Sequence, residues 1–430
     1  MQKYDAIVVG AGNGGLGAAC KLAKAGKKTL LIEQHNLPGG VATSFRRGRF
    51  EFEVALHELC DWGSEEDPGE TRKLLKNTLG LDIPWHRVDD VYRYITTDEN
   101  GNKLDVTMPA GRQAYIDKME YYVPGSRKSM EDFFALGDEY MAALVYIREA
   151  AGNPDPKYMM KHFPNFLRTV AYPSNAVLKA LKIPQRAIDI INCYWSYAGV
   201  DCDRMSALCT VVMTHKYVCR YPYIFNHTSH QMSTGLVERF RAFGGECRFN
   251  CHTEEILFDG SGHVCGLRTD TDTIETRHII WNGNPSLAYA NAIPAKNLPE
   301  RNLKMANASR FSARMLVVYL GLNKTAEELG IKDYSVFYAQ SADTRREYDS
   351  MARIDTNKYF IYNRVNLRLY QGTPCYVALP KIFSEIRKGE KENEENTRNA
   401  AHACNGVRPC RLRPVRCSRR HRGSRCRRSR

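Results

Sequence analysis

The stretch VVGAGNGGLGAACKLAKAGKKTLLIEQ, residues Val8–Gln34, decides the fold. An apolar run at Tyr4–Val9 leads into glycines, apolar residues then recur at helical spacing, and Thr29–Glu33 forms a second apolar run. This order predicts a strand, a glycine turn, a helix and a second strand, with both strands buried in a parallel sheet. A complete unit of this kind, within about 30 residues, is the setting in which a glycine motif indicates a dinucleotide site.

Gly10, Gly12 and Gly15 form the pattern GxGxxG. In such a turn the first glycine permits the sharp bend, the second leaves room for a pyrophosphate, and the third lets the helix pack on the sheet. The backbone N–H groups of the turn, including those of Asn13 and Gly14, would meet a diphosphate at the positive end of the helix dipole.

Glu33 stands at the end of the second predicted strand and is followed by Gln34. A carboxylate at this position accepts hydrogen bonds from the ribose hydroxyls of adenosine and disfavours a 2′-phosphate. NADP is therefore a poor candidate, whereas these residues alone leave NAD and FAD open. Glu33 and Gln34 are candidate cofactor-binding residues.

Length and composition predict a globular enzyme of two domains, since 430 residues exceed a single compact core. The net charge of +14 is concentrated at one end, because residues 401–430 hold 11 arginines and no Asp, Glu or Lys. The body is nearly balanced, and we expect no nucleic-acid partner. Its cysteines form no CxxC pairs, so we expect no metal site, and no apolar run is long enough to span a membrane. A cytoplasmic location is expected.

The middle of the chain predicts a different kind of structure. Residues 91–109 contain two short runs around the turn DENGN and predict a hairpin, and residues 113–150 predict helices. Residues 155–200 mix apolar side chains, lysines and prolines. They predict short core helices, with a surface for peripheral membrane contact or an apolar substrate as the alternative. Strand-like runs at residues 246–281 predict a three-stranded meander between two sheet strands.

A longer pattern resembles a known family. After Glu33 the chain continues with NLPGG and then SFRRGRFEFEVALHEL. Together with the glycine motif, this resembles the N-terminus of the FAD-dependent phytoene desaturase family, which includes carotenoid isomerases and retinol saturases. Its pattern of PGG, SF, GF, FD and a His is matched by Pro38, Gly39, Gly40, Ser44, Phe45, Gly48, Phe50, Phe52, Glu53 and His57. The resemblance extends in order over roughly residues 4–390.

The resemblance implies an α/β fold with FAD as cofactor: a Rossmann-like FAD-binding domain with a β-meander, and an inserted mixed α+β substrate domain. The implied boundaries are 1–84 and 231–284 for the FAD-binding domain, 85–230 and 285–398 for the substrate domain, and 399–430 for an Arg/Cys-rich tail. Gly39 and Gly40 would lie against the cofactor, and the backbone of Thr253 would meet the adenine edge. Val41 stands near the flavin where the family often has Arg or Lys, and Ala55 replaces a usual Gly.

The activity that the resemblance implies is hydride transfer between flavin and a C–C bond of an apolar substrate of carotenoid, isoprenoid or retinoid type. His57 is the candidate proton donor, with a structural histidine as the alternative reading. The electron acceptor or donor is not identified. Two further hypotheses remain: a flavin-dependent cis–trans isomerase without net redox change, and an inactive truncated family member.

The last residues carry the third hypothesis. Members of the family end with a glycine-rich segment that covers the flavin, whereas this sequence reads NGVRPCRLRPVRCSRRHRGSRCRRSR. Arginine without lysine, with cysteines at irregular intervals, is typical of off-frame translation of GC-rich DNA. We expect the reading frame to be lost near residues 400–405, and the alternative is a genuine basic tail.

Overall fold

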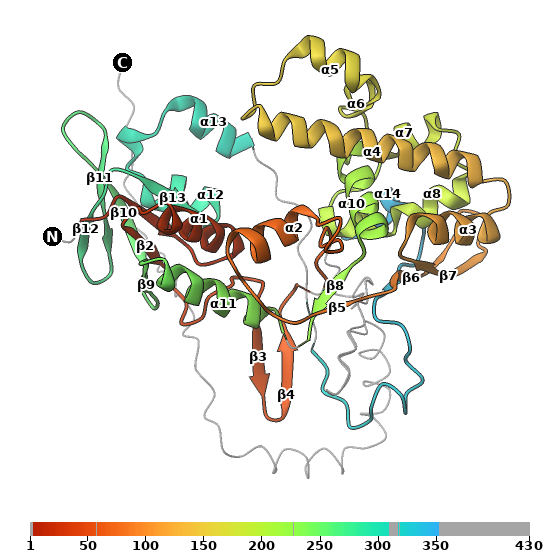
Figure 1. Cartoon of the computed structure of the whole chain (residues 1–430), viewed down its shortest axis with the longest axis horizontal. Helices are drawn as coiled ribbons and strands as arrows, with labels where there is room; N and C mark the ends of the chain where they lie inside the picture. Colours follow the sequence, from red (N-terminus) through yellow and green to blue (C-terminus); the bar gives the residue numbers. More distant parts are fainter. Residues whose placement is uncertain (1–2, 57, 227, 309–316, 318, 352–430) are drawn as a thin grey trace, which may run out of the picture. The chain divides into compact units, whose positions relative to one another are not determined.

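The computed structural model describes residues 3–351, except residues 57, 227, 309–316 and 318 (Figure 1). All described residues belong to one compact unit, residues 1–380. The Arg/Cys-rich tail expected at residues 399–430 lies outside the described residues, as does the end of the expected substrate domain.

A four-stranded parallel sheet lies at the start of the fold, in the order β13-β1-β2-β9. Strand β1 covers Ala6–Val9, β2 Thr29–Ile32, β9 Glu246–Arg248 and β13 Ile279–Trp281. Strands β1 and β2 are buried along their whole length, as the sequence predicts for strands covered on both faces. The Rossmann-like α/β fold expected from the sequence is confirmed, with strands one or two residues shorter than predicted.

Alternate residues of β1 enter two different cores because successive side chains of a strand point to opposite faces. Val8 packs against helices α1, Asn13–Lys24, and α11, Ser229–Ala242, which cover one face. Ile7 and Val9 pack against a meander on the other face. The meander strands are β10, Thr253–Phe258; β11, Val264–Thr269; and β12, Thr273–Glu275. The meander expected between two sheet strands is therefore present.

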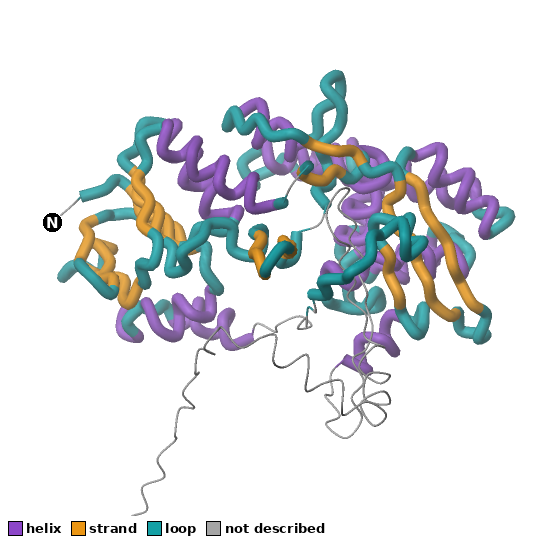
Figure 2. Tube along the Cα trace, turned by 90° about the horizontal axis from the view of Figure 1, so that it is seen from below, coloured by secondary structure: helices purple, strands orange, loops and turns teal. Residues whose placement is uncertain are grey.

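A second sheet has three strands in the order β14-β6-β7. Strands β6, Asp90–Thr97, and β7, Lys103–Pro109, form the expected hairpin, and β14, Val336–Tyr338, adds to β6 in parallel. Helices pack beside these strands (Figure 2) and share one hydrophobic core with them. The helices of this core are α3 Arg112–Tyr122, α4 Arg127–Glu149, α5 Pro156–His162, α6 Pro164–Thr169, α7 Ser174–Ala180, α8 Gln185–Ile191 and α10 Ala207–Arg220.

Two small strand pairs connect these regions. The hairpin of β3, Ser44–Arg47, and β4, Phe50–Glu53, follows the PGG segment. Strands β5, Trp85–Arg87, and β8, Tyr223–Phe225, pair antiparallel, so the chain leaves for the helical region and returns from it at neighbouring positions. The domain boundaries themselves stay a prediction.

The remaining elements are short. They are α2 Glu70–Arg72, η1 Lys73–Thr78, η2 Asn192–Tyr194, α9 Trp195–Ala198, α12 Pro285–Leu287, η3 Ala288–Ala292, η4 Ala295–Asn297, α13 Glu300–Ala308 and α14 Thr344–Met351. Among the helices of the described part, none is long and apolar enough to cross a membrane.

The packing of α1 predicts a measurable loss of stability. Leu16 is fully buried between the sheet and α11. Leu16→Ala should lower the free energy of unfolding by about 2–5 kcal/mol because it leaves a cavity in a close-packed core. Urea denaturation measures this change. Leu287→Ala is the control, since Leu287 is half exposed, and should change stability by less than about 0.5 kcal/mol. Equal effects of the two substitutions would contradict this packing.

Candidate dinucleotide site and adjoining cavity

The turn between β1 and α1 is built from close backbone contacts. Gly10 has φ +98°, a conformation that favours glycine. A Cβ on Gly15 would lie 1.9 Å from the carbonyl oxygen of Gly10, so no larger residue fits there. The first and third glycines of the motif therefore serve the turn and the helix packing.

The N-terminus of α1 is open to a ligand. Gly12 is the N-cap and supplies no side-chain hydrogen bond, and Asn13 and Gly14 are exposed. The first N–H groups of a helix have no partner within the helix, and they sit at the positive end of its dipole. These features suit a phosphate group, and the residues present fit the diphosphate of a dinucleotide.

Glu33 lies at the carboxyl end of β2 and points toward the turn. Its Oε2 accepts a hydrogen bond of 2.7 Å from the N–H of Ala11, and its Oε1 accepts one of 2.8 Å from the N–H of His35. Each carboxylate oxygen has further lone pairs, so Glu33 can still accept bonds from a ribose. The adjacent Gln34 is exposed, with its Oε1 3.2 Å from Nδ1 of His252.

The second glycine turn lies directly against the first. The N–H of Gly39 donates to the carbonyl of Ala11 at 2.7 Å, and Gly39 forms an isolated bridge with Gly12. A Cβ on Gly40 would lie 3.3 Å from Cα of Gly12. The structure thus brings the two turns together. Val41, the next residue, is 69% exposed.

Helix α11 holds the second turn and its hairpin in place. Ser233 Oγ donates to the carbonyl of Ala42 at 2.7 Å. The buried carboxylate of Glu53 accepts bonds from the N–H of Ser229 at 2.9 Å and from its Oγ at 2.5 Å, at the first residue of the helix. A carboxylate at a helix N-terminus is stabilised by the helix dipole.

Asn282 is a residue of the site that the sequence reasoning missed. It follows β13, and its side chain fills the space beside the first turn, since a Cβ on Gly14 would lie 2.4 Å from its Oδ1. Parallel strands end at the same edge of a sheet, so a polar residue directly after the run IIW was the available signal.

Thr253, the expected adenine contact, begins β10. It is buried, and its Oγ1 has no hydrogen-bond partner among the described residues. Two residues earlier, the N–H of Cys251 donates to the carbonyl of Glu33 at 3.0 Å. The start of β10 therefore lies next to the end of β2, and the role of Thr253 stays a prediction.

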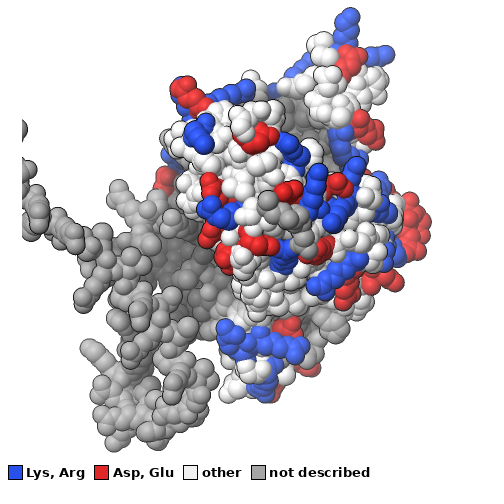
Figure 3. All heavy atoms as spheres, turned by 90° about the vertical axis from the view of Figure 1, so that its left-hand side faces the viewer, with Lys and Arg blue, Asp and Glu red and all other residues white. Residues whose placement is uncertain are grey.

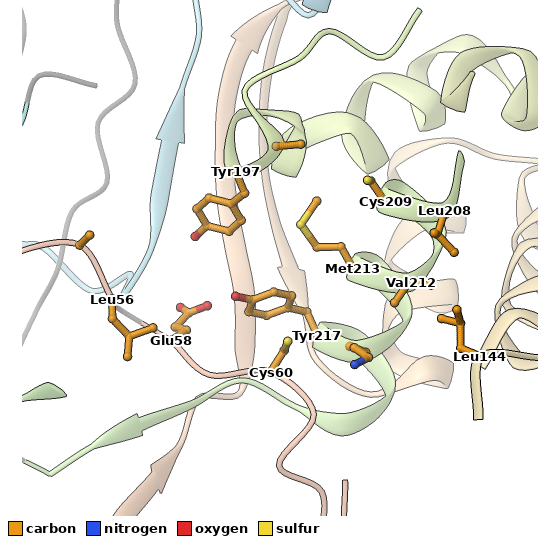
Figure 4. A pocket seen from close by; sticks show the side chains of 13 residues that line it. Leu56, Glu58, Cys60, Leu144, Tyr197, Leu208, Cys209, Val212, Met213 and Tyr217 are labelled. Carbon is orange, nitrogen blue, oxygen red and sulfur yellow. The ribbon is translucent and has the colours of Figure 1, made fainter. Parts of the chain in front are cut away.

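His57, the candidate proton donor, lies outside the described residues. Its sequence neighbours line a cavity of about 640 Å³. The lining is mostly apolar: Ala55, Leu56, Glu58, Cys60, Leu144, Tyr197, Ala198, Leu208, Cys209, Val212, Met213, Lys216 and Tyr217 (Figure 4). Sequence reasoning did not identify this set, because its members come from segments far apart in the chain.

Glu58 is the buried carboxyl group of this cavity. Its Oε1 accepts a hydrogen bond of 2.9 Å from Ser335 Oγ, and its Oε2 has no partner among the described residues. Burial raises the pKa of Glu58 to about 8, and the Ser335 bond opposes this shift only in part. Glu58 is therefore mainly neutral at pH 7 and can donate a hydrogen bond.

The strand, turn and helix unit, with Glu33 at the end of the second strand, defines a dinucleotide-binding fold of the Rossmann type. Residues 8–76 match the family model described as "NAD(P)-binding Rossmann-like domain".

Curated relatives show more closely which dinucleotide-binding proteins this chain resembles. All-trans-retinol 13,14-reductase of Rattus norvegicus is 22% identical over 393 residues, which cover 88% of this chain and 60% of the relative. Chloroplastic prolycopene isomerase of Daucus carota is 47% identical over 343 residues, which cover 75% of this chain and 52% of the relative. The chain thus spans little more than half the length of these relatives. The chain is therefore similar to a retinol reductase and to a carotenoid-related isomerase, which is consistent with the family resemblance of the sequence.

Solved structures agree on the fold. An oxidoreductase from Methanosarcina mazei matches with a TM-score of 0.56 and 16% identity, covering 94% of this chain and 85% of that one. A redesigned putrescine oxidase matches with a TM-score of 0.56 and 17% identity, covering 87% of this chain and 74% of that one. At these identities the likeness shows the fold alone.

The buried Glu58 predicts a pH-dependent stability. Its pKa is raised in the folded protein, so the folded state binds more protons than the unfolded state above pH of about 4.3, and stability falls as pH rises toward 8. Glu58→Gln removes this titration. Between pH 5 and pH 7 the wild type should lose about 2–3 kcal/mol relative to Glu58→Gln, since one pKa unit corresponds to about 1.4 kcal/mol. Urea denaturation at each pH measures the difference.

Glu149, which is exposed on α4, provides the matched control. Glu149→Gln should leave the pH dependence of the wild type unchanged. Parallel stability curves for wild type and Glu58→Gln would show that Glu58 ionises in the folded protein as it does in the unfolded chain.

Proposed function

We propose that this chain binds FAD and belongs to an oxidoreductase of the phytoene desaturase type, acting on C–C bonds of an apolar isoprenoid-like substrate. The observation that carries the proposal is the contact between the two glycine turns at the N-terminus of α1, next to Glu33. The resemblance of the sequence to the FAD-dependent phytoene desaturase family supports FAD over NAD at this site.

The roles of the residues follow from their positions. The N–H groups at the start of α1 would hold the diphosphate, and Glu33 would accept bonds from the ribose. Gly39 and Gly40 would let the second turn pack against the first beside the cofactor, since a Cβ on Gly39 would lie 2.4 Å from the carbonyl oxygen of Ala42, and α11 and Glu53 keep this segment in place. Flavin, when bound, supplies the hydride chemistry. The apolar cavity would exclude water from the substrate, and His57 remains the proposed proton donor.

Flavin binding is tested with two glycines of the same helix region. Gly12→Ala would place a Cβ 3.1 Å from Nδ2 of Asn282, so that this side chain must shift beside the diphosphate-binding turn, and should weaken FAD retention at least about tenfold. Gly17→Ala is the matched control, because a Cβ there meets nothing within 4 Å. The visible absorbance of the purified proteins, after incubation with FAD and gel filtration, measures retention. A colourless wild type that cannot be reconstituted with FAD would refute the proposal. Equal FAD retention by the two variants would show that the glycine turn does not bind the cofactor.

Isomerisation without net redox change is the second candidate, favoured by the likeness to the carrot isomerase. Mass spectrometry of the product separates the two, since reduction or desaturation changes the hydrogen count and isomerisation does not. Absence of either product from a chain that retains flavin would instead support an inactive member of the family. A cytoplasmic location also remains a proposal.

We further propose that helices α5 and α6 together form a surface that contacts an anionic membrane peripherally. Residues 156–172 contain Lys157, Lys161 and Arg168 but no Asp or Glu. The apolar side chains exposed in this segment are Tyr158, Met160, Leu167 and Tyr172. Basic and apolar side chains together suit an anionic lipid surface. By contrast, basic and acidic side chains are interspersed on the face shown in Figure 3.

This contact is tested with vesicles of phosphatidylcholine, with and without phosphatidylserine. The wild type should cosediment with the anionic vesicles, and Lys157→Glu with Lys161→Glu should weaken binding about tenfold or more, since each basic residue near the surface contributes about 1 kcal/mol. Lys103→Glu is the control, because Lys103 is the exposed first residue of β7. Equal binding to neutral and anionic vesicles, or no effect of the α5 variant, would contradict the proposal.

A further inference from the structure

The cavity lined by Glu58 has a polar end and an apolar end. In Figure 4 the carboxyl group of Glu58 and the hydroxyls of Tyr197 and Tyr217 point toward one another. The apolar side chains of Leu144, Leu208 and Val212 lie toward the opposite side. A volume of about 640 Å³ is within the range of sites for small molecules.

The polar end contains an atom that needs a partner. Glu58 is only 4% exposed, Ser335 satisfies its Oε1, and its Oε2 has no hydrogen-bond partner among the described residues. A buried polar atom left without a partner destabilises the folded state, so such atoms usually meet a ligand, a water or another residue. A ligand made only of hydrocarbon would leave this atom unsatisfied.

The same segment connects the cavity with the proposed cofactor site. Glu53 binds the first residue of α11, whereas Glu58, five residues later, lines the cavity. Five residues span at most about 17 Å, so the polar end of the cavity lies within that distance of the residue that binds the start of α11.

We infer that this cavity binds an apolar chain that ends in an uncharged oxygen group, an alcohol or an aldehyde, and that the neutral carboxyl of Glu58 donates a hydrogen bond to that oxygen. Glu58 acts here as a specificity residue that selects against a pure hydrocarbon. The choice of an isoprenoid chain rests on the proposed function. The selection of an oxygen-bearing end rests on the cavity.

Charge distinguishes this ligand from an amine. A protonated amine would require an ionised Glu58, but burial favours the neutral carboxyl. Lys216 also lines the cavity. Its ammonium group forms an ion pair of 2.9 Å with the carboxylate of Asp61, which is not one of the lining residues. The neutral oxygen group therefore fits the polar end better than a cation.

The test compares three probes with the same chain: farnesol, the hydrocarbon farnesene and farnesylamine. Binding to the full chain is measured by quenching of tryptophan fluorescence, with flavin absorbance recorded on the same samples. The wild type should bind farnesol at least about tenfold more tightly than farnesene, the effect expected for one buried hydrogen bond. Glu58→Leu should abolish this preference, and Glu58→Gln, which keeps a donor, should retain most of it. The ratio between wild type and variant cancels the different solubilities of the probes.

Each outcome decides the inference. The inference is overturned if the wild type binds farnesene as tightly as farnesol or more tightly, or if it binds farnesylamine most tightly of the three probes. It is also overturned if Glu58→Leu keeps the preference for farnesol over farnesene. Circular dichroism identifies a misfolded Glu58→Leu, and loss of the preference in Glu58→Gln would then contradict the donor role. If the protein prefers farnesol but binds no flavin, the inference stands and the proposed function is refuted. If the protein binds flavin but shows no preference for farnesol, the proposed function stands and the inference is refuted.

Discussion

The contact between the two glycine turns is the constraint on which the rest of the site depends. The N–H of Gly39 donates to the carbonyl of Ala11, and a Cβ on Gly40 would lie only 3.3 Å from Cα of Gly12. This arrangement keeps the N-terminus of α1 open and places exposed N–H groups beside the end of β2. A dinucleotide site requires this combination of an uncovered helix terminus and a backbone without side chains.

Helix α11 stabilises this arrangement of the two turns. It packs beside α1 on one face of the parallel sheet, and its N-terminal residues bind both the turn and the hairpin that follows. The buried carboxylate of Glu53 satisfies N–H and O–H groups at the start of the helix. The same segment then continues to Glu58, so one short stretch of chain connects the hairpin after the glycine turns with the apolar cavity.

Much of the first half of the site could be predicted from the sequence. Gly10, Gly12 and Gly15 act within a few residues of one another, and Glu33 follows the next strand, so their roles depend on local geometry that a pattern can express. Asn282 was within reach only through the rule that parallel strands end at one edge. Glu58 could not be found, because its burial depends on tyrosines of the helical region and on Ser335, which lies 277 positions away.

The sequence by itself determined the strand, turn and helix order, the meander and the resemblance to a family of flavin enzymes, because periodicity and glycine spacing act over short distances. Only the tertiary structure decided which segments meet. Ser233 binds Ala42 although 191 positions separate them, and a cavity with one unsatisfied carboxyl oxygen forms among three distant stretches. Such contacts depend on how the buried faces of whole elements pack together, and no local pattern of residues specifies that packing.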